Sequence, residues 1–146
     1  MNMKKLLSIF ILALILSSCT SGEVRNCEKV VRRHDTNNTP WIVYYYDVVG
    51  RDSTWVEEKW YHDNGVLNLE GPIVNGKREG LFKGYYPSGK LMSTGVFHEG
   101  LREGRGVVYH ENGNISIDGN YKGGAMTGIW KFYDENGEVI DVQEYE

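Results

Sequence analysis

A pattern of 24 residues repeats almost four times along the second half of the chain. Its clearest mark is a glycine that recurs at constant spacing, without insertion or deletion. A tyrosine precedes each of these glycines, and an aliphatic residue follows it, at fixed distances. The repeated positions are Gly65, Gly89, Gly113 and Gly137; Tyr61, Tyr85, Tyr109 and Tyr133; and Leu67, Leu91, Ile115 and Val139. A fixed period of this length is typical of a repeat array, in which each unit packs mainly against its neighbours.

Each unit is expected to form a β-hairpin. In the unit 80–104, residues 81–86 predict a short strand, 87–90 a tight turn, 91–98 a return strand and 99–104 a looser connection to the next unit. Three of the four turns contain Asn-Gly, a strong hairpin signal, because glycine adopts positive φ readily and asparagine tolerates it. The repeat region also lacks the apolar period of a helix. The predicted fold class is therefore all-β, an elongated, twisted antiparallel sheet of successive hairpins.

Apolar and polar residues alternate along the return strands, which indicates a sheet with one packed face and one face in water. Stacked units would place residues of equal phase in columns, such as Ile73, Phe97 and Tyr121. A glycine lies in the middle of three return strands, at Gly71, Gly95 and Gly119. Glycine is costly at such a position unless space is needed, so we expect a close aromatic ring or a strand bend there.

The segments at the two ends of the array depart from the pattern. Residues 41–57 predict a hairpin that is out of step with the repeats and that we interpret as an N-terminal cap over one sheet edge. In the last unit Gln143 replaces the mid-strand glycine, which suggests a C-terminal cap. The expected division is 1–18, 19–40, 41–57 and 58–146, with repeats at 58–80, 81–104, 105–128 and 129–146, the last of them partial.

Residues 1–18 have the build of a secretory signal, with basic Lys4 and Lys5, an apolar core and a small-residue end. The stretch Leu16-Ser17-Ser18-Cys19 resembles the lipobox of bacterial lipoproteins. This resemblance implies that the signal is removed before Cys19 and that the Cys19 thiol is acylated, which anchors the chain to a membrane of the bacterial cell envelope. Thr20, in place of Asp, implies the outer membrane. The alternative is an ordinary secretory signal with a cysteine near its end.

Residues 19–40 are polar and read as a tether, with at most a short strand around 29–33. If Cys19 is acylated, Cys27 has no second cysteine in the chain. Two interpretations of Cys27 stay open, a buried or tether-borne thiol and an intermolecular disulfide.

The charge balance argues against nucleic acid as a partner. The net charge is −4, and without residues 1–18 the chain keeps 14 basic and 20 acidic residues, a net charge of −6. Nucleic acids and anionic lipids bind to clustered Lys and Arg side chains, so an acidic chain is a poor candidate for either.

No arrangement of residues predicts catalysis, a metal site or a cofactor. The histidines are His34, His62, His98 and His110, and none has the spacing of a metal-binding motif, so we interpret them as solvated residues beside turns. Asp63, Glu111 and Glu135 recur at one phase of the repeat, which indicates turn chemistry, whereas a general acid–base pair would be unique. We therefore expect that the protein is not an enzyme.

The unit Tyr85-Tyr86-Pro87-Ser88-Gly89-Lys90-Leu91, followed by Gly95-Val96-Phe97-His98-Glu99-Gly100, resembles the MORN repeat (membrane occupation and recognition nexus) in its longer bacterial variant. The resemblance covers residues 58–146, with three complete units and one partial unit in phase. It implies an elongated, twisted antiparallel sheet of hairpins. Proteins with this variant are often labelled antitoxin components.

The leading functional hypothesis is a lipid-anchored protein of the cell envelope that uses the repeat sheet as an interaction or scaffold surface for an unidentified protein partner. The candidate contact residues, where they are not packed, are Trp55, Trp60, Tyr86 and Trp130. One alternative is an antitoxin or immunity protein that neutralises a toxin, for which the acidic chain would suit a basic partner. A hydrolase that acts on envelope polymers is a third hypothesis, and we rank it last.

Overall fold

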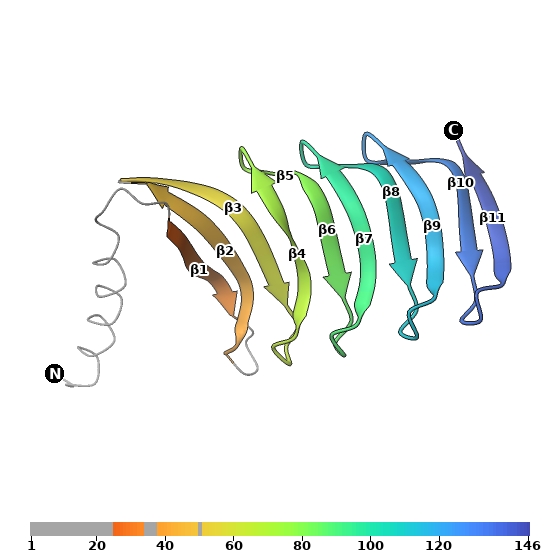
Figure 1. Cartoon of the computed structure of the whole chain (residues 1–146), viewed down its shortest axis with the longest axis horizontal. Helices are drawn as coiled ribbons and strands as arrows, with labels where there is room; N and C mark the ends of the chain where they lie inside the picture. The colour runs from red at the N-terminus through yellow and green to blue at the C-terminus, as the bar shows by residue number, and fades with distance from the viewer. Residues whose placement is uncertain (1–24, 34–37, 50) are drawn as a thin grey trace.

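The computed structural model describes residues 25–33, 38–49 and 51–146, and this part of the chain consists of strands and turns (Figure 1). The strands are β1 (Arg25–Arg33), β2 (Pro40–Val49), β3 (Asp52–Tyr61), β4 (Leu67–Val74), β5 (Lys77–Arg78), β6 (Gly80–Tyr85), β7 (Leu91–His98), β8 (Leu101–Tyr109), β9 (Ile115–Lys122), β10 (Ala125–Tyr133) and β11 (Val139–Tyr145). Among the described residues, no helix is long and apolar enough to cross a membrane. The predicted all-β class is confirmed.

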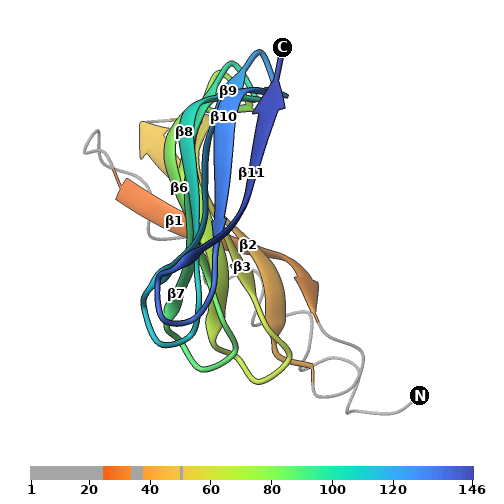
Figure 2. The ribbon, with the colours of Figure 1, turned by 90° about the vertical axis from the view of Figure 1, so that its right-hand side faces the viewer.

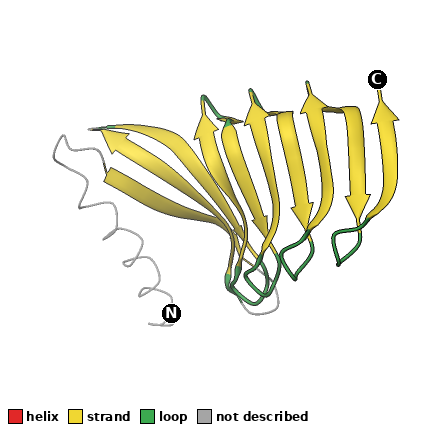
Figure 3. Cartoon of the chain, turned by 45° about the vertical axis from the view of Figure 1, so that its right-hand side comes forward, coloured by secondary structure: helices red, strands yellow, loops and turns green. Residues whose placement is uncertain are grey.

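The strands form one open antiparallel sheet whose spatial order follows the chain, with the short β5 paired to β4 beside the main path. Figure 3 shows the strands in a single layer with the loops at its two ends. Figure 2 shows β1 crossing β11 at a large angle, so the sheet twists along its length. Successive hairpins in an elongated, twisted sheet are the architecture that the repeat predicts.

The N-terminal part of the sheet is larger than expected. The hairpin predicted after residue 40 forms as β2 and β3, but β1 pairs along nearly the whole length of β2 and covers its outer edge. The expected tether, with at most a short strand, is therefore wrong for Arg25–Arg33, which belongs to the sheet. The polar side chains of this segment hid the strand because an edge strand tolerates charge.

The turns at the lower ends of the hairpins in Figure 1 are three-residue loops rather than two-residue Asn-Gly turns. In the first, Gly65 N donates to His62 O over 2.9 Å and His62 N donates to Val66 O over 2.8 Å. Gly65 has φ +81°, as the turn requires, but Asn64 keeps negative φ, and its Oδ1 accepts a hydrogen bond from Val66 N. The prediction that asparagine shares the positive-φ region is wrong because its side chain stabilises the loop instead.

The turns at the upper ends are the two-residue turns, where the pattern predicted a looser connection. Both turn residues have positive φ in Asn75-Gly76, Glu99-Gly100 and Gly123-Gly124, as in a type I′ turn. β8 therefore begins at Leu101, directly after the turn. Sequence reasoning missed the central turn because glutamate rarely adopts positive φ; here Glu99 N donates to the Glu79 carboxylate over 2.7 Å, which stabilises the turn.

Aromatic rings pack directly over the mid-strand glycines. A Cβ atom at Gly71 would lie 2.4 Å from the Phe82 ring, and one at Gly119 would lie 2.1 Å from the Trp130 ring. Phe82 is 2% exposed and joins Ile73 and Phe97 in the buried cluster, against which Trp55 and Leu69 pack. The expected close ring is confirmed at Gly71 and Gly119. We call this side of the sheet, which carries Phe82, Phe97, Tyr121 and Trp130, the ring face.

Substitution of Gly71 by Ala is predicted to destabilise the fold, because the new methyl group would collide with the Phe82 ring. The expected loss is about 1–3 kcal/mol of unfolding free energy, the usual cost of overpacking. Gly95, one repeat later, is the matched control, since the nearest atom to its Cβ position is the flexible Arg102 Nη1 at 3.3 Å. Gly95→Ala should change stability by less than about 1 kcal/mol. Equal losses in urea denaturation would contradict the packing described here.

Candidate functional site

The central repeat lacks the ring that covers the mid-strand glycine in the units on either side. Phe82 lies over Gly71 and Trp130 lies over Gly119. The residue at the same position of the central repeat is Gly106, so no ring from that position covers Gly95. The ring face is therefore interrupted at one place, which we call the slot.

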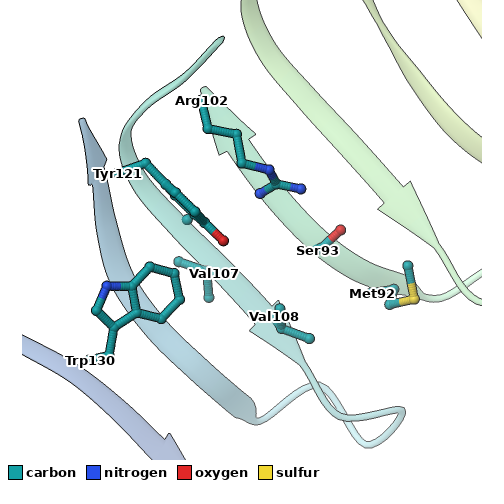
Figure 4. A pocket seen from close by; sticks show the side chains of 8 residues that line it. Met92, Ser93, Arg102, Val107, Val108, Tyr121 and Trp130 are labelled. Atoms are coloured by element: carbon teal, nitrogen blue, oxygen red, sulfur yellow. The ribbon is translucent and has the colours of Figure 1, made fainter. Parts of the chain in front are cut away.

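Three glycines from neighbouring strands form a row across this part of the sheet. Gly95 in β7 pairs with Gly106 in β8, and Gly106 pairs with Gly119 in β9. The slot has a volume of about 190 Å³ and opens on the ring face between β7 and β10 (Figure 4). Its lining residues are Met92, Ser93, Arg102, Gly106, Val107, Val108, Tyr121 and Trp130.

At the slot, an arginine side chain lies between two pairs of packed rings. Phe82 and Phe97 meet edge to face at 4.9 Å between centroids, and Tyr121 and Trp130 do so at 4.9 Å. Between these pairs stands Arg102, whose guanidinium carbon lies 5.4 Å from the Phe97 centroid and 5.0 Å from that of Tyr121. Both distances allow cation–π attraction. Figure 4 shows the Arg102 guanidinium beside the Tyr121 ring at the edge of the slot.

Arg102 differs from its counterpart one repeat earlier in its electrostatic environment. Arg78 binds the buried Glu58 carboxylate, with 2.6 Å between Nη2 and Oε1 and 2.7 Å between Nε and Oε1. The repeat position of Glu58 is occupied by Phe82 in the next unit. No carboxylate among the described residues forms an ion pair with Arg102. The slot therefore combines aromatic side chains with an arginine that forms no ion pair within the described part of the chain.

Trp130 is not a surface residue, so the prediction that it contacts a partner is corrected. Its side chain is 4% exposed and packs between Gly119 and the Tyr121 and Tyr145 rings. Its Nε1 donates a hydrogen bond to Asn120 O over 3.2 Å. Trp130 also lines the slot (Figure 4).

The other three predicted contact residues are half-buried and lie outside the slot. Trp55 packs on the buried cluster, 4.4 Å from the Tyr44 ring, and donates through Nε1 to Glu57 O. Trp60 packs edge to face on Trp41 at 6.1 Å, and its buried Nε1 forms no hydrogen bond to the described residues. The Tyr86 hydroxyl donates to Tyr109 O over 2.6 Å. The structure does not gather these residues into one surface.

Sequence reasoning missed Arg102, Tyr121 and Gly106 as site residues. The available signal was Gly106, which is small where the flanking units carry Phe82 and Trp130. A comparison of the residues that recur does not detect this departure. A comparison of the residues that differ between units, at positions 82, 106 and 130, does detect it.

Two of the histidines link neighbouring repeats at the lower turns. His62 Nε2 donates to Tyr85 O over 2.8 Å, and His110 Nε2 donates to Tyr133 O over 2.9 Å. Each carbonyl can only accept, so the proton of each ring lies on Nε2. Both side chains are half-buried, and the prediction that they are solvated is therefore wrong. Tyr86 performs the same linking role in the unit between them.

His98 is exposed and forms an ion pair at the upper turns instead. Its Nδ1 lies 2.8 Å from Glu79 Oε1, and the other Glu79 oxygen accepts from Glu99 N. The Glu79 hydrogen bond raises the pKa of His98, while hydrogen bonds from Glu99 N and His98 lower the pKa of Glu79. Across the described part of the chain, no group of three or more His, Cys, Asp or Glu side chains could hold a metal ion.

Cys27 is half-buried in β1, where it pairs across the sheet with Tyr46. The two interpretations of its thiol, including the intermolecular disulfide, stay predictions. Cys19 and His34 lie outside the described residues.

His98→Gln is predicted to lower Tm in a pH-dependent way. The Glu79 contact, which raises the pKa of His98, stabilises the fold fully when the pH is below the ordinary histidine pKa of 6.5. This contribution is lost as pH rises through the pKa of His98 in the folded chain. The lowered pKa of Glu79 contributes above its ordinary value of 4.5 and is lost as pH falls. The Tm difference from wild type should therefore be largest between these values and decrease as pH rises through the folded pKa of His98. A difference that is constant with pH would contradict this assignment.

The repeats match a known family. The family model described as MORN repeat variant matches the chain four times, at residues 56–75, 78–99, 102–122 and 126–146. The matches together cover more than half of the chain. No curated protein matches the sequence. The resemblance to MORN repeats is thus confirmed by the family model and by the sheet of hairpins: the chain belongs to the MORN repeat variant family.

Proposed function

We propose that this chain is a lipid-anchored protein of the bacterial cell envelope whose repeat sheet binds another protein. The observation that supports binding most directly is the slot, an opening of about 190 Å³ in an otherwise packed ring face. Arg102 and the Tyr121 ring present a cation and an aromatic surface there. Such groups are enriched where proteins make their strongest contacts.

The proposed anchor is the acylated Cys19, and its location the outer membrane, as the lipobox-like stretch and Thr20 suggest. Because β1 begins at Arg25, the link between lipid and sheet is shorter than the tether expected from the sequence. At no more than about 3.6 Å per residue, the six steps from Cys19 to Arg25 place the start of the first strand within about 22 Å of the acylated cysteine. The anchor would hold the β1 end of the sheet near the membrane surface.

The protein is proposed to act by binding rather than by catalysis. Two acidic side chains at the lower turns have structural partners. The Glu111 carboxylate, which belongs to the recurring set, accepts a hydrogen bond from Ser88 Oγ, and the Asp134 carboxylate in the last turn accepts them from Asn136 N and Glu138 N. The last contacts lower the pKa of Asp134. Groups that are occupied in this way are poor candidates for general acid–base chemistry.

The antitoxin alternative takes second place. It follows from the antitoxin label that proteins with this repeat variant often carry, and the acidic net charge would suit a basic toxin. At the slot, however, the group that lacks a countercharge among the described residues is the basic Arg102. An acidic ligand suits this site better than a basic one.

The anchor is tested by growing cells with radioactive palmitate. Label should appear on the wild-type chain, because its Cys19 thiol is acylated, and should be absent from Cys19→Ala. Cys27→Ala is the matched control, since it removes a thiol from β1 and should keep the label. Label that survives in Cys19→Ala would overturn the anchor.

The binding face is tested by photocrosslinking in intact cells. A photoreactive residue at Met92, which lines the slot, should give a specific adduct with a protein partner. The same residue at Lys83, on the opposite side of the sheet from its neighbour Phe82, should not, because the alternation of strand residues points it away from the ring face. Equal adducts at both positions, or none at Met92, would contradict a partner on the ring face.

A further inference from the structure

We infer that the slot binds an aromatic side chain next to a carboxylate, carried on an acidic segment of the partner protein. This inference rests on the proposed function and names the chemistry of the ligand. The aromatic ring would lie over Gly106, where the chain has no side chain of its own, and the carboxylate would pair with Arg102.

The case for a ring follows from the repeat itself. At the equivalent position of the two neighbouring units, a ring covers the mid-strand glycine, Phe82 over Gly71 and Trp130 over Gly119. A ring from outside would complete the interrupted packing between the Phe97 and Tyr121 rings. The volume suffices, because the slot measures about 190 Å³ and a cavity of about 150 Å³ accommodates benzene. Edge-to-face packing on Tyr121 or Trp130 would add to the apolar burial.

Two side chains now lean into the space and would have to turn. A Cβ atom at Gly106 would lie 2.8 Å from Tyr121 Cε2, and one at Gly95 would lie 3.3 Å from Arg102 Nη1. Arg102 Nη1 is the end of a long flexible side chain, whereas Tyr121 Cε2 belongs to a rigid ring that packs on Trp130. For the ligand to enter, Arg102 would adopt another rotamer and the Tyr121 ring would turn about its side-chain bonds. The glycine row of Gly95 and Gly106 lets the incoming ring approach the backbone closely.

The case for a carboxylate follows from the comparison of the two arginines. Arg78 lies 5.0 Å from the Phe82 ring and 5.5 Å from the Phe97 ring while it binds the Glu58 carboxylate. Arg102 likewise lies beside two rings, Phe97 and Tyr121, but forms no ion pair with the described residues. A guanidinium offers a planar pair of donors that matches a carboxylate. A ligand that supplies ring and carboxylate together would reproduce at Arg102 what the chain supplies internally at Arg78.

A protein segment is a better occupant than a free aromatic acid because the slot is not an enclosed cavity but is open to solvent. A small molecule there would keep part of its ring in water. A partner protein that lies over the ring face would exclude water from the ring and from the ion pair, which strengthens both contacts.

The test uses the full chain in detergent micelles and the blocked dipeptide Ac-Phe-Asp-NH2, followed by the NMR signal of the Trp130 indole N–H. Dissociation constants are compared between variants. Gly106→Phe fills the slot from within, and Arg102→Gln removes the cation; each should weaken binding at least about tenfold, which corresponds to about 1.4 kcal/mol. The control is Arg105→Gln, an exposed arginine of β8 that pairs with Asp118 and is absent from the slot lining. It should bind as wild type does.

Three further probes separate the parts of the inference. Ac-Leu-Asp-NH2 lacks the ring and Ac-Phe-Asn-NH2 lacks the charge, so each should bind at least about tenfold more weakly than Ac-Phe-Asp-NH2. Equal binding of either, or unchanged binding by a folded Gly106→Phe chain, would overturn the inference. If phenylacetate binds as tightly as the dipeptide, the claim that the ligand is a segment of a partner protein is contradicted. If the peptides fail while the Met92 adduct persists in cells, the proposed function stands without this ligand.

Discussion

The contact on which the structure depends is that of an aromatic ring lying flat over a glycine in the neighbouring strand. The described part of the chain forms a single layer, so no second sheet or helix covers the ring face. The sheet must bury apolar surface by laying its own side chains across adjacent strands. Phe82 can do so only because Gly71 has no side chain, and the same holds for Trp130 and Gly119. Each unit thus obtains part of its core from the next, as in other repeat arrays.

Polar contacts between units complete this arrangement at the turns. His62 and His110 each donate to a tyrosine carbonyl in the following repeat, and Asn64 and Asn112 reach a backbone carbonyl there as well. Recurrence in phase is therefore evidence of structure in this chain. The candidate site lies at Gly106, where the repeat pattern is broken. The missing side chain leaves room there, and Arg102 forms no ion pair with the residues that the structure describes.

Much of the fold could be predicted from residue patterns. Periodic glycines and alternating apolar residues indicated hairpins in sequential order, and the mid-strand glycines indicated nearby rings. The turn types predicted for the two ends of the hairpins were wrong. Asn-Gly adopts positive φ at both residues only when the asparagine side chain does not hydrogen-bond within the loop. Here Asn64 Oδ1 binds Val66 N. The polar sequence of Arg25–Arg33 fits an edge strand and a linker equally, so residue patterns alone do not predict that this segment joins the sheet.

The amino-acid sequence by itself determined the period, the strand order and the family, since these depend on local turn and strand preferences repeated at fixed spacing. Only the tertiary structure decided which aromatic residues are covered. Trp130 carries no local sign of burial, because Gly119, the residue that makes room for it, lies on another strand. The slot likewise joins residues of four strands, β7 to β10, around a missing side chain. The chemistry of the slot depends on contacts between side chains of different units. A repeat pattern gives the spacing of residues along the chain but not these contacts.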